Sequence, residues 1–177
     1  SRLFGSNKLM YEVEGNTMYL RTLRQLQKAA AKMQNSRIVV VTQEKYAEII
    51  DAAKEIGAEV LINPQPERGI SSSMQIGLEI AKDADACLFT VSDQPWLTAE
   101  TIIALHDAFQ SENKGMACTV WGEKTGNPCI FSEKYYKELM AISGDKGGKQ
   151  IIKKHPEDVA YLKISDEREL QDVDVPL

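Results

Sequence analysis

Short apolar runs alternate with segments of helical periodicity along this chain, and this alternation restricts its fold more than any other feature. Runs of strand length are predicted at 37–42 (RIVVVT), 59–62, 85–91, 116–121, 128–131 and 159–164. Apolar residues at helical spacing predict helices between them, at 17–34, 44–56, 72–82, 98–110, 133–141 and 148–154. Continuous apolar strands that alternate with helices are typical of a mostly parallel sheet with helices on both faces. The sequence therefore predicts a three-layer α/β/α domain.

The chain is predicted to form one domain over residues 1–177, because no repeat, low-complexity tract or linker interrupts the pattern. Its formal net charge is −5, so it has no chain-wide basic field that would bind a nucleic acid or an anionic membrane. No apolar run approaches the roughly 20 residues that cross a bilayer, and no signal peptide is visible. We therefore expect a cytoplasmic protein without a nucleic-acid or membrane partner.

The first residues, SRLFGSNKL, are polar and typical of a loop, with no strand before them. Doubly wound α/β domains usually begin with a central strand. We therefore expect a strand and a short loop to precede Ser1.

An aspartate, Asp93, directly follows the apolar run LFTV, where a buried strand should end. In open α/β sheets, ligands bind beyond the carboxyl ends of the strands. A carboxylate there can bind a hard cation such as Mg²⁺, which prefers oxygen ligands and usually keeps substrate phosphates in its shell. Asp93 could equally do no more than help to cap the next helix, and the local sequence leaves both interpretations open.

Two further groups of polar residues lie near the start and the end of the chain. Arg2 and Lys8 lie in a loop of small residues, where they could neutralise a triphosphate, or could belong to a solvated arm. The loop has no GxxxxGK[ST] motif, so it is not a P-loop. Asp172 and Asp174 alternate in the segment LQDVDVPL, which could be only a solvated tail.

Three internal loops also carry candidate residues. The loop NPQPERGISSSM at 63–74 contains Gly69, which permits a close backbone approach, and serines that could supply hydroxyls or only cap a helix. The segment GEKTGNPCIF at 122–131 could be a plain turn before a strand. The segment SGDKGGK at 143–149 could be a simple connection between helices.

In this order, the six motifs SRxFGxxK, NPxxxxGxxxS, DQPxL, GNPxxF, GDKGG and DxDxP resemble a known family. They are similar to those of the molybdenum cofactor cytidylyltransferases, MocA-like members of the MobA-like nucleotidylyltransferase family. The resemblance runs from Ser1 to about Pro176. It implies a Rossmann-like nucleotidyltransferase fold of the nucleotide-diphospho-sugar transferase type, with a mostly parallel mixed sheet. In the family a strand and a glycine loop come before the serine that Ser1 matches, so both are expected upstream.

The resemblance also implies a role for each motif. Lys8 and Arg2 would contact the nucleotide phosphates, and Asp93 would act with them in catalysis. Asp93 and Asp174 would hold Mg²⁺. The remaining implied positions bind the two substrates: the first loop and the 63–73 loop would lie near the nucleotide, and the later turns would face a pterin-bearing cofactor. These positions are Ser1, Asn63, Gly69, Ser73, Gln94, Asn127, Pro128, Gly144 and Asp145.

The implied reaction transfers CMP from CTP to the terminal phosphate of the molybdenum–molybdopterin cofactor and releases pyrophosphate. A transient contact with a molybdenum hydroxylase, which would receive the product, is a further implied partnership. Three alternatives stay open. They are a guanylyltransferase acting on the same cofactor, a nucleotidylyltransferase for another phosphorylated acceptor, and a catalytically silent cofactor-binding partner of a molybdoenzyme. The motifs DQP, GDKGG and DVDVP favour the cytidylyl branch.

Overall fold

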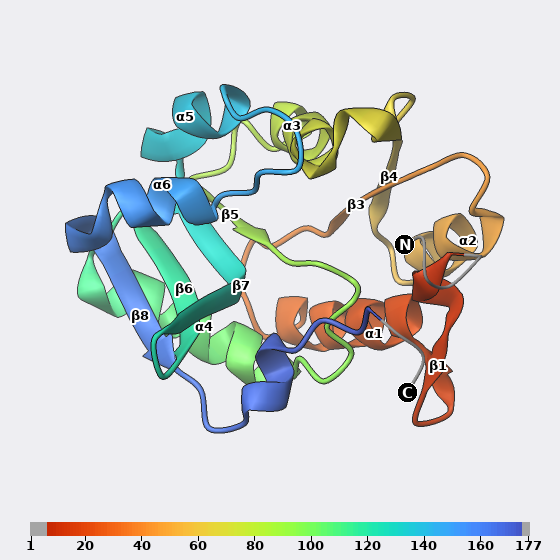
Figure 1. Cartoon of the computed structure of the whole chain (residues 1–177), viewed down its shortest axis with the longest axis horizontal. Helices are drawn as coiled ribbons and strands as arrows, with labels where there is room; N and C mark the ends of the chain where they lie inside the picture. The colour runs from red at the N-terminus through yellow and green to blue at the C-terminus, as the bar shows by residue number, and fades with distance from the viewer. Residues whose placement is uncertain (1–6, 175–177) are drawn as a thin grey trace.

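The structure is a computed structural model, and it describes residues 7–174. Its largest sheet has four strands in the order β5-β7-β6-β8 (Figure 1). The strands are β5 (Ala86–Phe89), β7 (Lys124–Ser132), β6 (Met116–Trp121) and β8 (Val159–Lys163). β6 and β8 are parallel, and β7 runs antiparallel to both of its neighbours. The predicted mixed sheet is therefore confirmed, and its antiparallel strand is β7.

A second, parallel pair of strands lies apart from this sheet. It consists of β3 (Val39–Thr42) and β4 (Glu59–Ile62), in register from Val39↔Glu59 to Thr42↔Ile62. Within residues 7–174, no hydrogen-bonded ladder joins β3 to β5. The residues of β3 and β5 are only half-buried, whereas the first four residues of β6 are buried. The single continuous sheet expected from the strand pattern is therefore split into two parts in the described chain.

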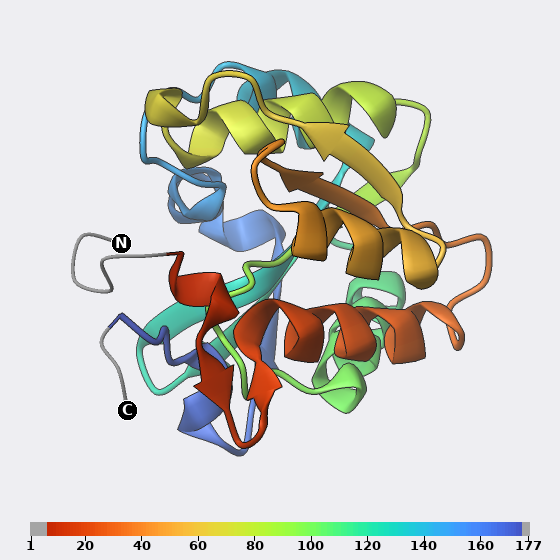
Figure 2. The same cartoon turned by 90° about the vertical axis from the view of Figure 1, so that its right-hand side faces the viewer.

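Helices cover both faces of the strands, which gives the three predicted layers (Figures 1 and 2). Side chains of β6 alternate between the two faces, as they do in any strand. Met116 and Cys118 pack in a core with α3 (Ile70–Ile80), α5 (Tyr136–Met140) and α6 (Lys149–Lys154). Ala117 points to the opposite face and packs in the cluster that contains Leu105 of α4 (Ala99–Glu112). Two further helices, α1 (Met18–Ala30) and α2 (Ala47–Glu55), pack with β3 and β4 in a separate cluster.

Short elements complete the fold and account for most differences from the predicted boundaries. A small antiparallel hairpin, β1 (Glu12–Val13) and β2 (Asn16–Thr17), was not predicted, because two-residue strands carry no readable periodicity. Single-turn 3₁₀ helices lie at η1 (Lys8–Met10), η2 (Pro66–Arg68), η3 (Glu133–Tyr135), η4 (Pro156–Asp158) and η5 (Glu167–Leu170). Across residues 7–174, no helix is both long and apolar enough to span a bilayer.

Candidate functional site

A cleft of about 900 Å³ opens at the carboxyl ends of β3 and β5. Residues 41–43 line it at the end of β3, and residues 90–93 line it after β5. Residues 7–9, at the start of η1, and parts of the 63–73 loop complete its wall. This is the edge of the strands at which α/β proteins bind their ligands. Lys8, Asn63, Ser73 and Asp93, four of the residues predicted from the sequence, share this cleft.

An ion-pair triad lies at the mouth of the cleft. The Lys8 ammonium donates hydrogen bonds to Asp93 Oδ2 at 2.6 Å and to Asp174 Oδ1 at 2.9 Å. The side chains of Lys8 and Asp93 are 19% and 22% exposed, whereas that of Asp174 is 71% exposed. The structure thus brings together three predicted site residues from the beginning, middle and end of the described chain.

Local backbone contacts explain how these three residues meet. Asn7 caps η1, since its Oδ1 accepts from Leu9 N at 3.2 Å, and Lys8 is the first residue of that turn. Asp93 follows β5. Asp174 reaches the site because Val173 N donates to Asp93 O at 2.9 Å, which fixes the extended C-terminal segment beside the loop after β5 (Figure 1).

The charge balance of the triad favours cation binding. Burial lowers the pKa of Lys8, but the hydrogen bonds and negative charges of Asp93 and Asp174 outweigh this effect, so the pKa lies above its ordinary value. Asp93 Oδ1 is buried and has no hydrogen-bond partner among residues 7–174. A buried, unpaired carboxylate oxygen beside a second carboxylate is a donor set that suits a hard divalent cation.

The described chain contains no group of three or more His, Cys, Asp or Glu residues that could hold a metal ion by themselves. A catalytic Mg²⁺ does not need such a group, because it is usually held by one or two carboxylates together with substrate phosphates and water. Asp93 and Asp174 fit that pattern.

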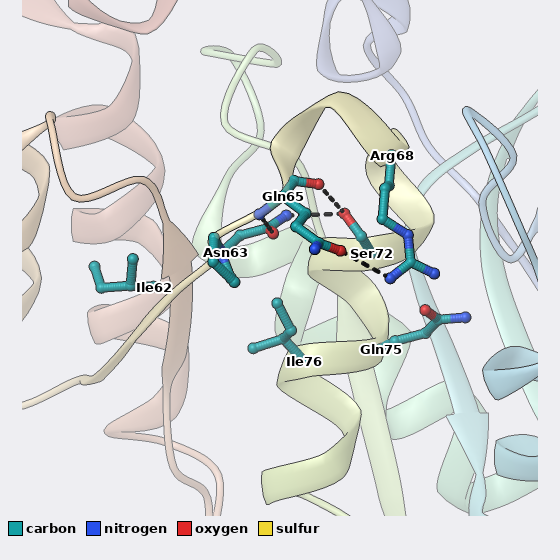
Figure 3. Close-up of a pocket in the computed structure, with 8 residues that line it drawn as sticks. Ile62, Asn63, Gln65, Arg68, Ser72, Gln75 and Ile76 are labelled. Atoms are coloured by element: carbon teal, nitrogen blue, oxygen red, sulfur yellow. Dashed lines mark hydrogen bonds between the residues drawn. The ribbon is translucent and has the colours of Figure 1, made fainter.

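The 63–73 loop is held by a buried asparagine. Asn63 Nδ2 donates to Ser72 Oγ and Ser73 Oγ, both at 2.9 Å, and Asn63 Oδ1 accepts from Gln65 N at 2.9 Å. Figure 3 shows this loop folded over the start of α3, beside a small cavity of about 300 Å³. The amide of Asn63 is thus engaged within the protein, and its predicted contact with the nucleotide stays a prediction.

The 63–73 loop also contacts the predicted loop at 144–145. Gly69 has a φ of 87°, and a Cβ added to it would come within 2.5 Å of Asp145 Oδ1 and of the carbonyl carbon of Gly144. Ser71 N donates to Gly144 O at 3.2 Å. Because only glycine fits this approach, the two loops form one wall. Close packing against the 144–145 loop therefore explains why residue 69 is a glycine, and its predicted nearness to the nucleotide stays a prediction.

The other predicted substrate positions do not line the cleft or lie outside the described residues. Asn127 and Pro128 lie within β7, where the Asn127 carbonyl accepts from Thr119 Oγ1 at 3.0 Å and the side chain of Pro128 is buried. Gln94 is 2% exposed, and its amide points into the protein. Ser1 and Arg2 lie outside residues 7–174. Contacts of these residues with a substrate stay predictions.

Sequence reasoning missed three cleft residues after β3. Gln43, Lys45 and Tyr46 line the same cleft as Asp93, and the Lys45 ammonium lies 5.0 Å from the centre of the Tyr46 ring. The available signal was their position after the predicted strand at 37–42, the same rule that singled out Asp93.

Comparisons with known proteins agree with this architecture. Over 96 residues, the chain is 32% identical to a bifunctional IPC transferase and DIPP synthase of Thermococcus kodakarensis, covering 52% of this chain and only 21% of that protein. It is 25% identical over 149 residues to a probable molybdenum cofactor guanylyltransferase of Pyrococcus horikoshii, covering 82% of this chain and 69% of the relative.

Among solved structures, Rv0371c from Mycobacterium tuberculosis H37Rv superposes with a TM-score of 0.76 at 21% identity, covering 100% of this chain and 85% of that one. A second structure of Rv0371c, in complex with manganese, superposes with a TM-score of 0.71 at 19% identity, covering 96% of this chain and 84% of that one. Likeness at this level of identity shows the fold. The family model described as the MobA-like NTP transferase domain matches residues 1–159. The chain therefore belongs to the MobA-like NTP transferase domain family.

Proposed function

We propose that this chain transfers CMP from CTP to the terminal phosphate of the molybdenum–molybdopterin cofactor, releasing pyrophosphate. One observation carries the proposal: the Lys8 ammonium lies between the carboxylates of Asp93 and Asp174, at the mouth of a cleft bounded by strand ends. Opposite charges gathered there suit a reaction in which two polyanions must approach each other.

In this reaction an oxygen of the acceptor phosphate attacks the α-phosphorus of CTP. A new P–O bond forms, the bond from the α-phosphorus to the bridging oxygen breaks, and pyrophosphate leaves. A phosphate monoester is already a nucleophile at neutral pH, so the step needs no histidine or cysteine. The protein contributes position and charge, as expected for phosphoryl chemistry.

Each residue of the triad has a distinct part in this proposal. Asp93 and Asp174 would hold Mg²⁺, for which the unpaired Asp93 Oδ1 is the clearest acceptor. The bound ion supplies positive charge next to the α-phosphate. Lys8 would exchange its carboxylate partners for the triphosphate oxygens, and Arg2 is proposed to assist it. The manganese complex of Rv0371c is compatible with a divalent ion in this fold.

The base of the nucleotide substrate has two candidates, cytosine and guanine. The relative from Pyrococcus horikoshii is a probable guanylyltransferase, which favours GTP as the second candidate substrate. A nucleotidylyltransferase for a different phosphorylated acceptor is a third candidate, because the family model describes an NTP transferase without naming an acceptor. A catalytically silent protein that binds the molybdenum cofactor is the remaining alternative.

One experiment separates these candidates. The protein is incubated with Mg²⁺, molybdopterin cofactor and each of the four NTPs, and pyrophosphate and the dinucleotide product are measured. We expect pyrophosphate release with CTP and formation of the cytosine dinucleotide cofactor. Pyrophosphate release with GTP only would establish the guanylyltransferase alternative. Turnover that needs another acceptor would reject the molybdenum cofactor as the substrate. Tight cofactor binding without turnover of any NTP would reject an enzyme.

A further inference from the structure

The segment that delivers Asp174 has no regular secondary structure of its own. Residues 171–174 lie outside helices and strands, and only Val173 among them is buried. Val173 packs with Val13 and Met18 beneath Trp96 and Tyr11. One apolar side chain and one backbone hydrogen bond fix a short extended segment weakly, since ordering each residue opposes folding by about 1–2 kcal/mol. The ion pair between Lys8 and Asp174 adds about 1 kcal/mol or less, because the Asp174 side chain is 71% exposed, so further contacts must hold Asp174 beside Asp93.

Two buried polar side chains supply these contacts. Gln94, next to Asp93, donates from Nε2 to Asp172 Oδ1 at 2.7 Å and to Leu170 O at 3.4 Å. Glu169 is 6% exposed and accepts from Thr98 N and Thr98 Oγ1, both at 3.1 Å. We call Gln94, Thr98, Glu169 and Asp172 the clasp. It ties the loop after β5 to the part of the C-terminal segment that directly precedes Val173.

Leu170, which lies between two clasp residues in the sequence, also contacts the segment predicted to face the second substrate. Its side chain lies against Gly126 of β7 and occupies the space that a Cβ there would need. Gly126 precedes Asn127 in the GNP motif. One short segment therefore contacts both the Asp93 loop and the GNP residues of β7.

The chemistry of Gln94 indicates that its amide is retained for position rather than for stability. Its side chain is buried, yet Gln94 Oε1 has no hydrogen-bond partner within the described residues. A buried, unpaired polar atom opposes folding, and an apolar side chain of similar size would avoid that penalty. The gain that remains is the hydrogen bond to Asp172, two residues before Asp174.

We propose that Gln94 and Asp172 are positioning residues that hold Asp174 against Asp93, with Glu169 and Thr98 as the second fastening of the same segment. The inference rests on the proposed function, because it assigns the purpose of the clasp to the cation site. It also gives Gln94 a role different from the direct substrate contact that the motif implied. Removing a direct hydrogen-bond partner of a metal ligand typically changes metal affinity by about 10- to 100-fold, and Gln94 and Asp172 act one contact further from the ligands, so we expect the low end of this range.

The test measures Mn²⁺ binding in the presence of CTP by electron paramagnetic resonance of the free ion, alongside thermal unfolding. We expect Gln94→Leu to weaken Mn²⁺ binding about tenfold while lowering the unfolding temperature little. Asp174→Ala should cause the largest loss of Mn²⁺ affinity. Adding Gln94→Leu to Asp174→Ala should cause no further loss. Gln75→Leu is the matched control, since Gln75 Nε2 donates to Met140 O and Ile142 O, on another part of the fold.

A second pair of variants keeps the inference testable if Gln94→Leu fails to fold. Asp172 is exposed, so its replacement should leave the fold intact. Asp172→Asn keeps an oxygen that accepts from Gln94 and should retain Mn²⁺ affinity, whereas Asp172→Ala should lose it about tenfold. Equal losses in both variants would mean that Asp172 acts through its charge or as a ligand, and would overturn the positioning role.

Mn²⁺ binding separates failure of the clasp from failure of the proposed function. Mn²⁺ binding that depends on Asp174 but not on Gln94 or Asp172 would overturn the clasp alone. A wild-type protein that binds no Mn²⁺ with CTP would overturn the proposed function and the clasp together. If Gln94→Leu lowers the unfolding temperature but leaves the Mn²⁺ affinity unchanged, Gln94 has only a structural role.

Discussion

Replacing Lys8 by methionine should tighten the binding of a divalent cation in the absence of nucleotide. The Lys8 ammonium lies 2.6 Å from Asp93 Oδ2 and 2.9 Å from Asp174 Oδ1, so it fills the space between the two carboxylates. A cation that binds there without nucleotide must displace Lys8 or share the carboxylates with it. Methionine keeps an apolar stem of similar length but removes the charge.

The size of the effect follows from these two contacts. With the dielectric constant of water, each contact is worth about 1.5 kcal/mol of Coulomb attraction at distances of 2.6 and 2.9 Å. Screening and side-chain entropy reduce this, most strongly for Asp174, which is 71% exposed. A net of about 1–2 kcal/mol remains, which corresponds to roughly a 5- to 30-fold gain in cation affinity when Lys8 is removed.

The assay is a titration of Mn²⁺ into the nucleotide-free protein, with Lys45→Met as the matched control. Lys45 lines the same cleft, but its recorded contact is with the Tyr46 ring rather than with either carboxylate of the triad. We expect tighter Mn²⁺ binding in Lys8→Met, unchanged binding in Lys45→Met, and weaker CTP binding in Lys8→Met. Unchanged or weaker Mn²⁺ binding in Lys8→Met would refute the idea that Lys8 and the cation compete.

Three further outcomes are expected. Asp93→Asn should abolish metal-dependent pyrophosphate release while keeping the unfolding temperature close to that of the wild type; substantial residual turnover would remove Asp93 from the mechanism. Gly69→Ala should destabilise the protein by about 1–3 kcal/mol in urea unfolding, because its φ of 87° and its contact with Asp145 leave no room for a Cβ. Asp158→Asn should destabilise by about 1–3 kcal/mol at pH 7, since the hydrogen bond from Lys134 holds the pKa of Asp158 well below its usual range. This stabilisation is present above the unfolded pKa of about 3.9 and is lost as the pH falls towards the folded pKa, so the difference between variant and wild type should shrink only below about pH 4; a constant difference would contradict it.

Asp93 was predictable because its position depends on local sequence alone. A carboxylate directly after a buried strand in an α/β pattern must lie at the ligand-binding edge of the sheet. Asp174 was different. No rule of periodicity or turn chemistry brings the end of the chain to that edge, and its place depends on the hydrogen bond from Val173 N to Asp93 O and on the buried amide of Gln94. Only the resemblance to a family pointed to it.

The extent of β7 was also beyond local reasoning. The sequence predicts a strand at 128–131, because Gly126 and Pro128 are typical of a turn. In the structure β7 runs from Lys124 to Ser132, and a register shift in its pairing with β6, between Cys118 and Thr119, accommodates the GNP residues. Such an irregularity is set by pairing between strands, which a single-strand pattern does not contain.

The expected strand before Ser1 stays a prediction.

Whether Asp93 and Asp174 hold the divalent ion can be seen in a crystal structure with CTP and Mn²⁺, in which the anomalous signal of manganese locates the ion. We expect a peak about 2.1 Å from a carboxylate oxygen of Asp93, within reach of Asp174, with Lys8 turned to the triphosphate. Manganese bound elsewhere, while Lys8 still bridges Asp93 and Asp174 beside a bound triphosphate, would contradict this expectation.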